Sequence, residues 1–186
     1  MTAVALPLGA PFTVEDVWGI AADGRRHELI EGALFVTPAP GAAHQTCTGW
    51  VWSLLVHAAG PDHLVLLAPF DWVAGPHSLF QPDVLVARRA DIAVTGDKRL
   101  ERTPLMVVEV ASPSTRMLDS GTKRLAFEAA GVPTYWIVDP DVPSLTVFRL
   151  HDGTYEEEAR VEGDDVYEGA EPFPVRVVPN QLRRGL

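Results

Sequence analysis

The chain has 186 residues, of which 47% are hydrophobic and 22% are charged, and this composition predicts one globular domain over residues 1–186. It has no run of about 18 apolar residues, which excludes a membrane-spanning helix. The formal net charge is -10, with 15 Lys and Arg against 25 Asp and Glu, and it weighs against a protein that coats nucleic acid. Cys47 is the only cysteine, so no internal disulfide can form, and we expect a cytoplasmic protein.

Local signals divide the first sixty residues into a helix, a hairpin and a second helix. Thr13 stands three residues before Asp16, a capping-box pattern that predicts a short helix over 13–24. Two strand-like runs in HELIEGALFVTPAP predict a hairpin around Glu31. The segment 44–61, HQTCTGWVWSLLVHAAGP, has apolar residues at helical spacing and predicts an amphipathic helix.

The middle of the chain alternates strands and helices. Three strand candidates, HLVLLAPFDWV, QPDVLVA and PLMVVEVA, are followed by a helix in DSGTKRLAFEAAG and a strand in PTYWIVDP. A strand, helix, strand sequence of this length predicts a parallel pair with a right-handed crossover. Further strands are expected from residue 144 onward. The predicted fold class is α/β, a mixed sheet flanked by helices, in the order helix, three strands, helix, strand.

A carboxylate interrupts the most apolar of these strands. Side-chain alternation over 105–111 places Glu109 on one face together with Val107 and Ala111. Burying an unpaired charge there costs at least several kcal/mol, so Glu109 needs a partner. Asp83 opens the preceding strand, and adjacent strands would bring the two carboxylates close together. Such a pair is repulsive unless a cation or a shared proton lies between the two groups.

A divalent cation would remove this repulsion. Magnesium accepts a few carboxylate oxygens and several waters, so Asp83, Glu109 and the main-chain carbonyl of Val110 can form an incomplete cage. A cation held in this way polarises a phosphoryl oxygen and activates a bound water. Lys123, on the following helix, can place an ammonium group beside the attacking water.

Each of these residues also has a purely structural explanation. Asp83 follows a proline, as a turn residue at the entry of a strand does, and Glu109 can form a buried ion pair with Lys123 or an arginine. A lysine such as Lys123 is typically solvated, and His44, which opens a helix, suits a polar cap or a surface position. The residues alone leave both explanations open.

Three stretches of the chain resemble one known family. HELIEGALFVTPAPGAAH, QPDVLV and PLMVVEVASPSTRMLDSGTKRLAFEAAGVPTYWIVDP resemble a large bacterial family of putative restriction endonucleases, long catalogued as a domain of unknown function. That family lies within the PD-(D/E)XK phosphodiesterase superfamily, and the likeness covers roughly residues 13–150. It implies a restriction endonuclease-like core of helix, three strands, helix, strand, with an N-terminal hairpin and C-terminal strands added.

The resemblance also implies roles for individual residues. By motif position, Asp83 and Glu109 are the expected ligands of Mg²⁺, or of Mn²⁺ as a substitute. The lysine that usually follows two residues after the second acid is absent, and Lys123 stands where a migrated lysine is expected. Glu28 and His44 match recurrent polar positions near the site and are expected to position water or a second ion.

The implied activity is that of a magnesium-dependent endonuclease that hydrolyses phosphodiester bonds in DNA. Water would attack in line and leave a 5′-phosphate and a 3′-hydroxyl. A homodimer is expected, because cutting both strands commonly needs two active sites. The candidate phosphate contacts are Arg88, Arg89, Arg116 and Arg124. The alternatives are a catalytically silent or regulatory binding module, which the negative net charge favours, and an enzyme that acts on RNA or a nucleotide.

Overall fold

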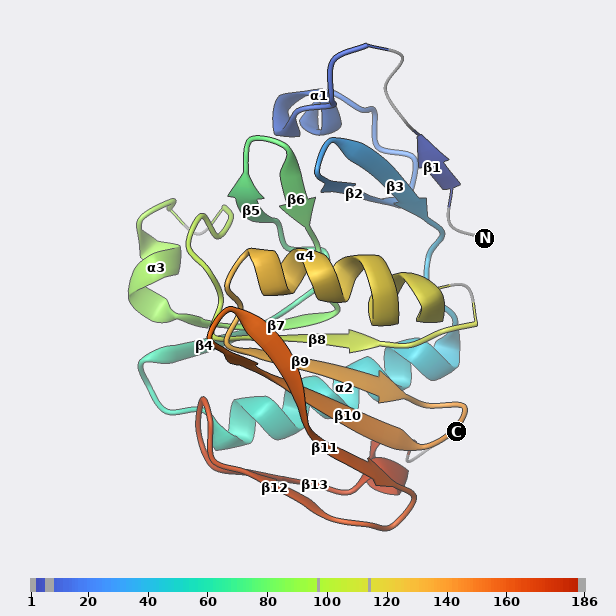
Figure 1. The fold of residues 1–186 in the computed structure, drawn as a ribbon, viewed down its shortest axis with the longest axis vertical. Coiled ribbons are helices and arrows are strands. Elements are labelled where there is room, and N and C mark those ends of the chain that lie inside the picture. The colour runs from blue at the N-terminus through green and yellow to red at the C-terminus, as the bar shows by residue number, and fades with distance from the viewer. Residues whose placement is uncertain (1–2, 6–8, 97, 114, 184–186) are drawn as a thin grey trace.

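The computed structural model describes residues 3–5, 9–96, 98–113 and 115–183, which form a small β-sheet, a larger β-sheet and the helices around them (Figure 1). The helices are α1 (Val14–Trp18), α2 (Ala42–Ala58), α3 (Arg89–Ala93), the π-helical segment η1 (Leu118–Lys123), α4 (Arg124–Ala129) and the 3-10 helix η2 (Pro179–Arg183). The strands are β1 (Ala3–Ala5), β2 (Arg26–Ile30), β3 (Ala33–Thr37), β4 (His63–Leu67), β5 (Trp72–Gly75), β6 (Ser78–Phe80), β7 (Val84–Arg88), β8 (Met106–Val110), β9 (Thr134–Asp139), β10 (Ser144–His151), β11 (Thr154–Glu162), β12 (Tyr167–Gly169) and β13 (Val175–Val177).

The larger sheet has six strands in the order β11-β10-β9-β8-β7-β4. Strands β8 and β9 pair in parallel, and η1 and α4 form the crossover between them. The other neighbouring strands of this sheet pair antiparallel. The predicted mixed sheet and the predicted parallel pair are therefore confirmed.

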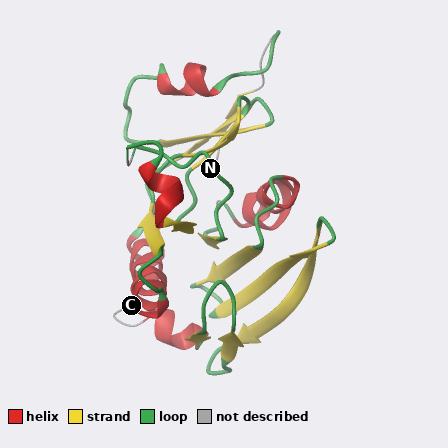
Figure 2. Cartoon of the chain, turned by 90° about the vertical axis from the view of Figure 1, so that its left-hand side faces the viewer, coloured by secondary structure: helices red, strands yellow, loops and turns green. Residues whose placement is uncertain are grey.

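Helices cover both faces of the larger sheet, with α2 on one side and α4 on the other (Figure 2). Val51 and Leu55 of α2 belong to the same buried cluster as Val108 of β8. Phe127 of α4 belongs to the opposite cluster with Val107. Neighbouring residues of β8 thus point to opposite faces, and each fully buried side chain of this kind contributes about 1.5–3 kcal/mol.

The smaller sheet has the order β1-β3-β2-β6-β5 and lies at the N-terminal end of the molecule (Figure 1). Its strands β2 and β3 form the predicted hairpin. The two turn residues, Glu31 and Gly32, have φ angles of 49° and 81°, as a two-residue type I′ turn requires. Glycine is needed at position 32 because a Cβ there would lie 2.4 Å from Cβ of Pro11.

The first predicted helix is present but shorter than expected. Thr13 caps it, since its hydroxyl accepts from the Asp16 N–H at 3.2 Å and its own N–H donates to the Asp16 carboxylate at 2.8 Å. The helix ends at Trp18 instead of continuing to Gly24. Residues 18–25 are all exposed, so further turns would have no apolar face to bury.

The candidate strand 63–73 proved wrong as a single element. Its first half is β4, at the edge of the larger sheet, and its second half begins β5, at the edge of the smaller one. Pro69 lies between them, and proline cannot donate to a strand ladder. The hairpin of β5 and β6 and the short helix α3 were not predicted.

The predicted helix after β8 begins as the π-helical segment η1 and continues as α4. Short π-helical turns often occur at functional sites. Here the segment buries two charged side chains, Asp119 and Lys123. The chain then leaves α4 and turns at Gly131, which has a φ of 75°.

The expected C-terminal strands are present, and the antiparallel hairpin of β10 and β11 extends the larger sheet. None of the helices within the described residues is long and apolar enough to cross a membrane. That residues 1–186 form a single domain stays a prediction.

Candidate active site

Strands β7 and β8 bring the two predicted acids to the same end of the larger sheet. Val84 pairs with Val108 across the antiparallel ladder, and the same register, continued by one residue, sets Asp83 opposite Glu109. Both carboxylates are 2% exposed. The N–H of Val110 donates to Oδ2 of Asp83 at 2.9 Å and so ties the first acid to the second strand. Asp83 is therefore more than a surface turn residue.

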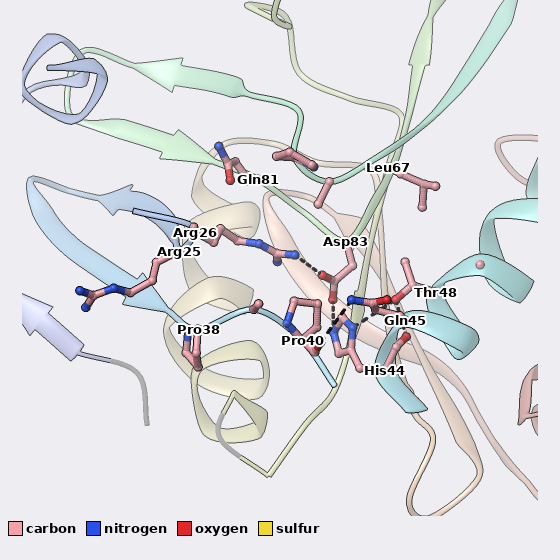
Figure 3. Close-up of a pocket in the computed structure, with 15 residues that line it drawn as sticks. Arg25, Arg26, Pro38, Pro40, His44, Gln45, Thr48, Leu67, Gln81 and Asp83 are labelled. Atoms are coloured by element: carbon pink, nitrogen blue, oxygen red, sulfur yellow. Dashed lines mark hydrogen bonds and ion pairs between the residues drawn. The ribbon is translucent and has the colours of Figure 1, made fainter. Parts of the chain in front are cut away.

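Asp83 lies between two basic side chains (Figure 3). Nη2 of Arg26 donates to Oδ1 at 2.8 Å, and Nε2 of His44 lies 3.0 Å from Oδ2. Burial raises the pKa of the Asp83 carboxyl, but the hydrogen bond with His44 and the charge of Arg26 outweigh burial and hold this pKa well below its ordinary value. Asp83 is therefore ionised at neutral pH.

Lys123 is buried between two carboxylates. Its Nζ lies 2.9 Å from Oε2 of Glu28 and donates to Oε1 of Glu109 at 2.9 Å. Burial lowers the pKa of the Lys123 ammonium, but the charges of Glu109 and Glu28 more than reverse this and raise it. The alternative of a solvated Lys123 is wrong, and the amine faces the second acid as the spacing indicated.

Glu28 joins the smaller sheet to this site. One of its oxygens contacts Lys123, and the other accepts the N–H of Gln81 at 2.9 Å, just before β7. The side chain is 1% exposed. Glu28 and His44, selected by the resemblance, thus both lie at the site, on β2 and in the first turn of α2.

Sequence reasoning missed two residues of the site, Arg26 and Asp119. Arg26 stands two residues before Glu28 on β2, and strand alternation places both side chains on the same face, which could have identified Arg26 from sequence. Asp119 stands four residues before Lys123, and it is 2% exposed. Its Oδ2 has no hydrogen-bond partner among the described residues. Burial, opposed by the charge of Lys123, raises the pKa of Asp119 from 3.8 to about 6.

These groups form an acid cluster, defined here as the four buried carboxylates of Glu28, Asp83, Glu109 and Asp119. The fixed cations in contact with it are Arg26 and Lys123, so carboxylates outnumber them. Burial, only partly opposed by Lys123 and reinforced by the charge of Asp83, raises the pKa of Glu109 well above its ordinary value. The acid cluster therefore favours an additional positive charge.

The chemistry of the donors fits a hard divalent cation. Oε1 of Glu109 accepts from Lys123 at 2.9 Å, and Oδ2 of Asp119 has no partner among the described residues. Nowhere in the described ranges do three His, Cys, Asp or Glu side chains converge on one point. The residues that can hold a cation are thus the predicted Asp83 and Glu109 with the carbonyl of Val110, an incomplete set that Mg²⁺ completes with waters. Both oxygens of Asp83 already have partners, so a cation must share them or displace one partner.

A pocket of about 540 Å³ opens onto this site (Figure 3). Arg26, His44 and Asp83 line it, whereas Glu109 and Lys123 are buried next to Asp83 and do not. The other lining residues are Gly24, Arg25, Pro38, Ala39, Pro40, Gln45, Thr48, Gly49, Leu67, Ala68, Pro69 and Gln81. Solvent thus reaches the Asp83 side of the site first.

Most of the candidate phosphate contacts lie elsewhere. Arg88 is at the far end of β7, opposite His63, about 16 Å along the strand from Asp83 at roughly 3.3 Å per residue. Arg89, the next residue, donates to the carbonyl of Pro61. Arg124 lies over the ring of Phe148, 5.6 Å from its centroid.

Arg116 alone of the four lies at the same end of the larger sheet as the site. Its Nη2 is 2.7 Å from Oδ2 of Asp139, the last residue of β9. Val138, the residue before Asp139 on β9, pairs with Val110 of β8, so Asp139 lies at the end of the sheet that carries the site. Arg116 is already engaged by this carboxylate.

Comparisons with known proteins agree with this fold. The model of the Uma2 family, described as "putative restriction endonuclease", matches residues 15–180. The crystal structure of a putative nuclease belonging to DUF820 from Anabaena variabilis superposes with a TM-score of 0.73 at 19% sequence identity, and the match covers 92% of this chain and 97% of that one. No curated protein is significantly similar. The restriction endonuclease-like core expected from the sequence is confirmed.

Proposed function

Because this chain belongs to the Uma2 family of putative restriction endonucleases, we propose that it is a metal-dependent nuclease that hydrolyses phosphodiester bonds in DNA. The observation that supports this proposal most directly is the meeting of Asp83 and Glu109 on adjacent strands, with the ammonium of Lys123 2.9 Å from Glu109. Two acids and an amine in one buried place are the groups that this hydrolysis needs.

The proposed cofactor is Mg²⁺, or Mn²⁺ as a substitute. Asp83, Glu109 and the carbonyl of Val110 would hold it, and their hard oxygen donors are the kind that both ions accept. When bound, such a cation supplies polarisation of a phosphoryl oxygen and a water of lowered pKa.

The protein's own groups have separate tasks in this proposal. Lys123 keeps its proton, orients the attacking water and offsets negative charge that develops on the phosphate. Glu28 fixes the position of Lys123 through their 2.9 Å contact. As the water oxygen bonds to phosphorus, the water gives up one proton to solvent and the bond to the 3′ oxygen breaks. The 3′ oxygen takes up one proton from solvent, so no net proton is consumed in this exchange. The products are a 5′-phosphate and a 3′-hydroxyl.

The test uses plasmid DNA and end-labelled single-stranded and duplex DNA, each incubated with the purified protein in Mg²⁺, in Mn²⁺ and in chelator; cleavage of any of these substrates supports the proposal. We expect cleavage with either metal and none with chelator. Glu109→Ala, Asp83→Ala and Lys123→Ala should each abolish it, whereas Arg88→Ala, a change at an exposed cation far from the site, should leave it unchanged. Cleavage that persists in Glu109→Ala would exclude the assignment.

A second candidate is a catalytically silent or regulatory binding module. It is favoured by one observation: Asp83 and Lys123 each contact two side chains of the protein, as in a structural ion-pair network. Thermal melting with Mg²⁺ or Mn²⁺ separates the two candidates. A rise in melting temperature that disappears in Asp83→Asn supports the metal site, and no rise in the unaltered protein supports the silent module.

The expected homodimer stays a prediction. Sedimentation at several protein concentrations, with and without DNA, measures the mass directly. A single species with the mass of one chain under all conditions would contradict it.

A further inference from the structure

We infer that the pocket beside Asp83 binds one unstacked nucleotide of single-stranded DNA. The substrate is then a single strand or an unpaired strand end, and not a continuous duplex. This inference rests on the proposed nuclease function and names its substrate class.

The walls of the pocket suit a nucleobase. Pro38, Pro40, Leu67 and Pro69 line it with apolar surface, and Leu67 is 38% exposed. A volume of about 540 Å³ is within the range of pockets that enclose a small ligand. Unstacked bases bind to proteins through an apolar face and through polar groups at the edge of the ring. Proline and leucine side chains can supply the first of these contacts.

Polar groups in the same pocket suit the edge of a base. The amide nitrogen of Gln45 donates to the carbonyl of Pro40 at 3.3 Å, and that of Gln81 donates to Asp71 at 2.7 Å. These contacts fix both side chains and leave the amide oxygens to accept from the N–H groups of a base. In Figure 3, Gln81 lies above Asp83 and Gln45 lies below it, beside His44.

The phosphate of the same nucleotide has its own partner. Arg26 lines the pocket, its side chain is 19% exposed, and its guanidinium holds Asp83 at 2.8 Å. A guanidinium offers several N–H donors, so Arg26 can contact a phosphate oxygen while it keeps its hydrogen bond with Asp83. A nucleotide with its base in the pocket thereby brings its phosphate to the acid cluster.

The distribution of charge argues against a long duplex footprint. Proteins that grip a duplex commonly neutralise about 6–10 phosphates with Lys and Arg. Among the described residues, the pocket is lined by just two such side chains, Arg25 and Arg26, and Arg25 already contacts Asp23 at 3.0 Å. The net charge of the chain is -10. Asp83 is 2% exposed, so a scissile phosphate must enter the pocket, and an unpaired nucleotide does so without the cost of unpairing.

A substitution at Gly49 can fill the pocket and so test this inference. Gln45, Thr48 and Gly49 share one face of α2, at i, i+3 and i+4, and all three line the pocket. A Cβ at Gly49 would meet no heavy atom within 4 Å. Gly49→Phe therefore extends a ring into the pocket without disturbing the core. The control is His57→Phe, which places the same phenyl ring, in exchange for an imidazole, at an exposed position of the same helix, about 12 Å away at 1.5 Å per residue.

The experiment measures binding of fluorescently labelled DNA by anisotropy, in chelator, so that it does not depend on cleavage. The probes are a single strand without secondary structure and a blunt hairpin duplex of related sequence. We expect the single strand to bind at least about tenfold more tightly, a difference of about 1.4 kcal/mol. Gly49→Phe should lose this binding about tenfold or more, and His57→Phe should keep it.

Two results would overturn the inference: equal or tighter binding of the duplex, or undiminished single-strand binding by Gly49→Phe. If Gly49→Phe melts below His57→Phe, then Leu67→Trp, which narrows the pocket from another wall, replaces it in the same comparison. Cleavage is read separately. Single-strand binding that Gly49→Phe abolishes, with no cleavage in Mg²⁺ or Mn²⁺, refutes the proposed hydrolysis and supports this inference. If Gly49→Phe and the unaltered protein cleave plasmid DNA equally well, the proposed hydrolysis is supported and this inference is refuted.

Discussion

The buried ammonium of Lys123 is the only fixed cation that contacts Glu28 and Glu109 within the part of the chain that the structure describes. Both carboxylates are almost completely buried, so neither can turn to water if this partner is lost. At the scale of single residues, the stability of the site therefore depends on the ion pairs that Lys123 forms with Glu28 and Glu109.

Replacing Lys123 tests this dependence. In chelator, Lys123→Met should lower the free energy of unfolding by about 3–5 kcal/mol, because it leaves two buried carboxylates without a cation. Arg124→Met, at the neighbouring cation, should cost less than about 1 kcal/mol, since it loses a contact with the ring of Phe148 and one exposed hydrogen bond to the carbonyl of Ser120. Urea denaturation of both variants measures the difference. Equal losses would show that the buried pairing is energetically unimportant.

Asp119 predicts a pH dependence. Its pKa of about 6 in the folded protein lies above its ordinary value of 3.8, so the folded state holds a proton that the unfolded state releases between these values. The free energy of unfolding should therefore fall as pH rises through this window. A shift of this size corresponds to at most about 3 kcal/mol.

Asp119→Asn removes this effect. The variant should gain stability relative to the unaltered protein as pH increases from about 4 to about 7, and the two proteins should differ least at the acidic end. Urea denaturation at several pH values in chelator measures the difference. A difference that stays constant over this range would contradict the buried, raised pKa of Asp119.

At the scale of elements, the hairpin of β2 and β3 matters because β2 carries both Arg26 and Glu28. The turn of this hairpin depends on Gly32, whose φ is 81° and whose Cβ position lies 2.4 Å from Pro11. Displacing the turn would shift the strand that supplies two contacts of the site.

Gly32→Ala should therefore destabilise the protein more than Gly24→Ala. Both glycines have positive φ, 81° and 74°, so each alanine costs about 1–2 kcal/mol of backbone strain. Only at position 32 does the new methyl group also clash, whereas nothing lies within 4 Å of it at position 24. Thermal melting of the two variants gives the comparison. Equal melting temperatures would mean that the hairpin can shift away from Pro11 at no cost.

The order of elements in the larger sheet could be predicted from sequence because each element carries its own periodicity. Alternation correctly placed Val107 and Val108 on opposite faces, and strand adjacency correctly set Asp83 near Glu109. The split of residues 63–73 between two sheets could not be predicted from local sequence. It depends on the pairing of the second half, β5, with β6 in the smaller sheet.

The missed contacts of the site have the same cause. Arg26 and Asp83 are 57 residues apart, and they meet only because the smaller sheet packs beside β7. No local pattern around either residue contains that information. The resemblance, by contrast, did select Glu28, because a family motif records such long-range contacts indirectly.

At the scale of the whole molecule, the net charge of -10 bears on how the proposed DNA substrate can be bound. If the proposed pocket contacts one phosphate through Arg26, the logarithm of the single-strand binding constant should fall against the logarithm of salt concentration with a slope of about -0.7. Anisotropy titrations at several salt concentrations measure this slope. A slope steeper than about -4 would reveal a basic track outside the pocket.

The placement of Arg26 and Glu28 on one short strand has a consequence for shortened versions of this protein. A product that starts after residue 40 would retain every strand of the larger sheet. Asp83, however, would lose the guanidinium of Arg26, and Lys123 would lose Glu28, one of its two anions. Such a truncation would remove no predicted metal ligand and should still be inert. If the proposed hydrolysis is correct, it therefore depends on residues 26–37 of the smaller sheet as well as on the larger sheet.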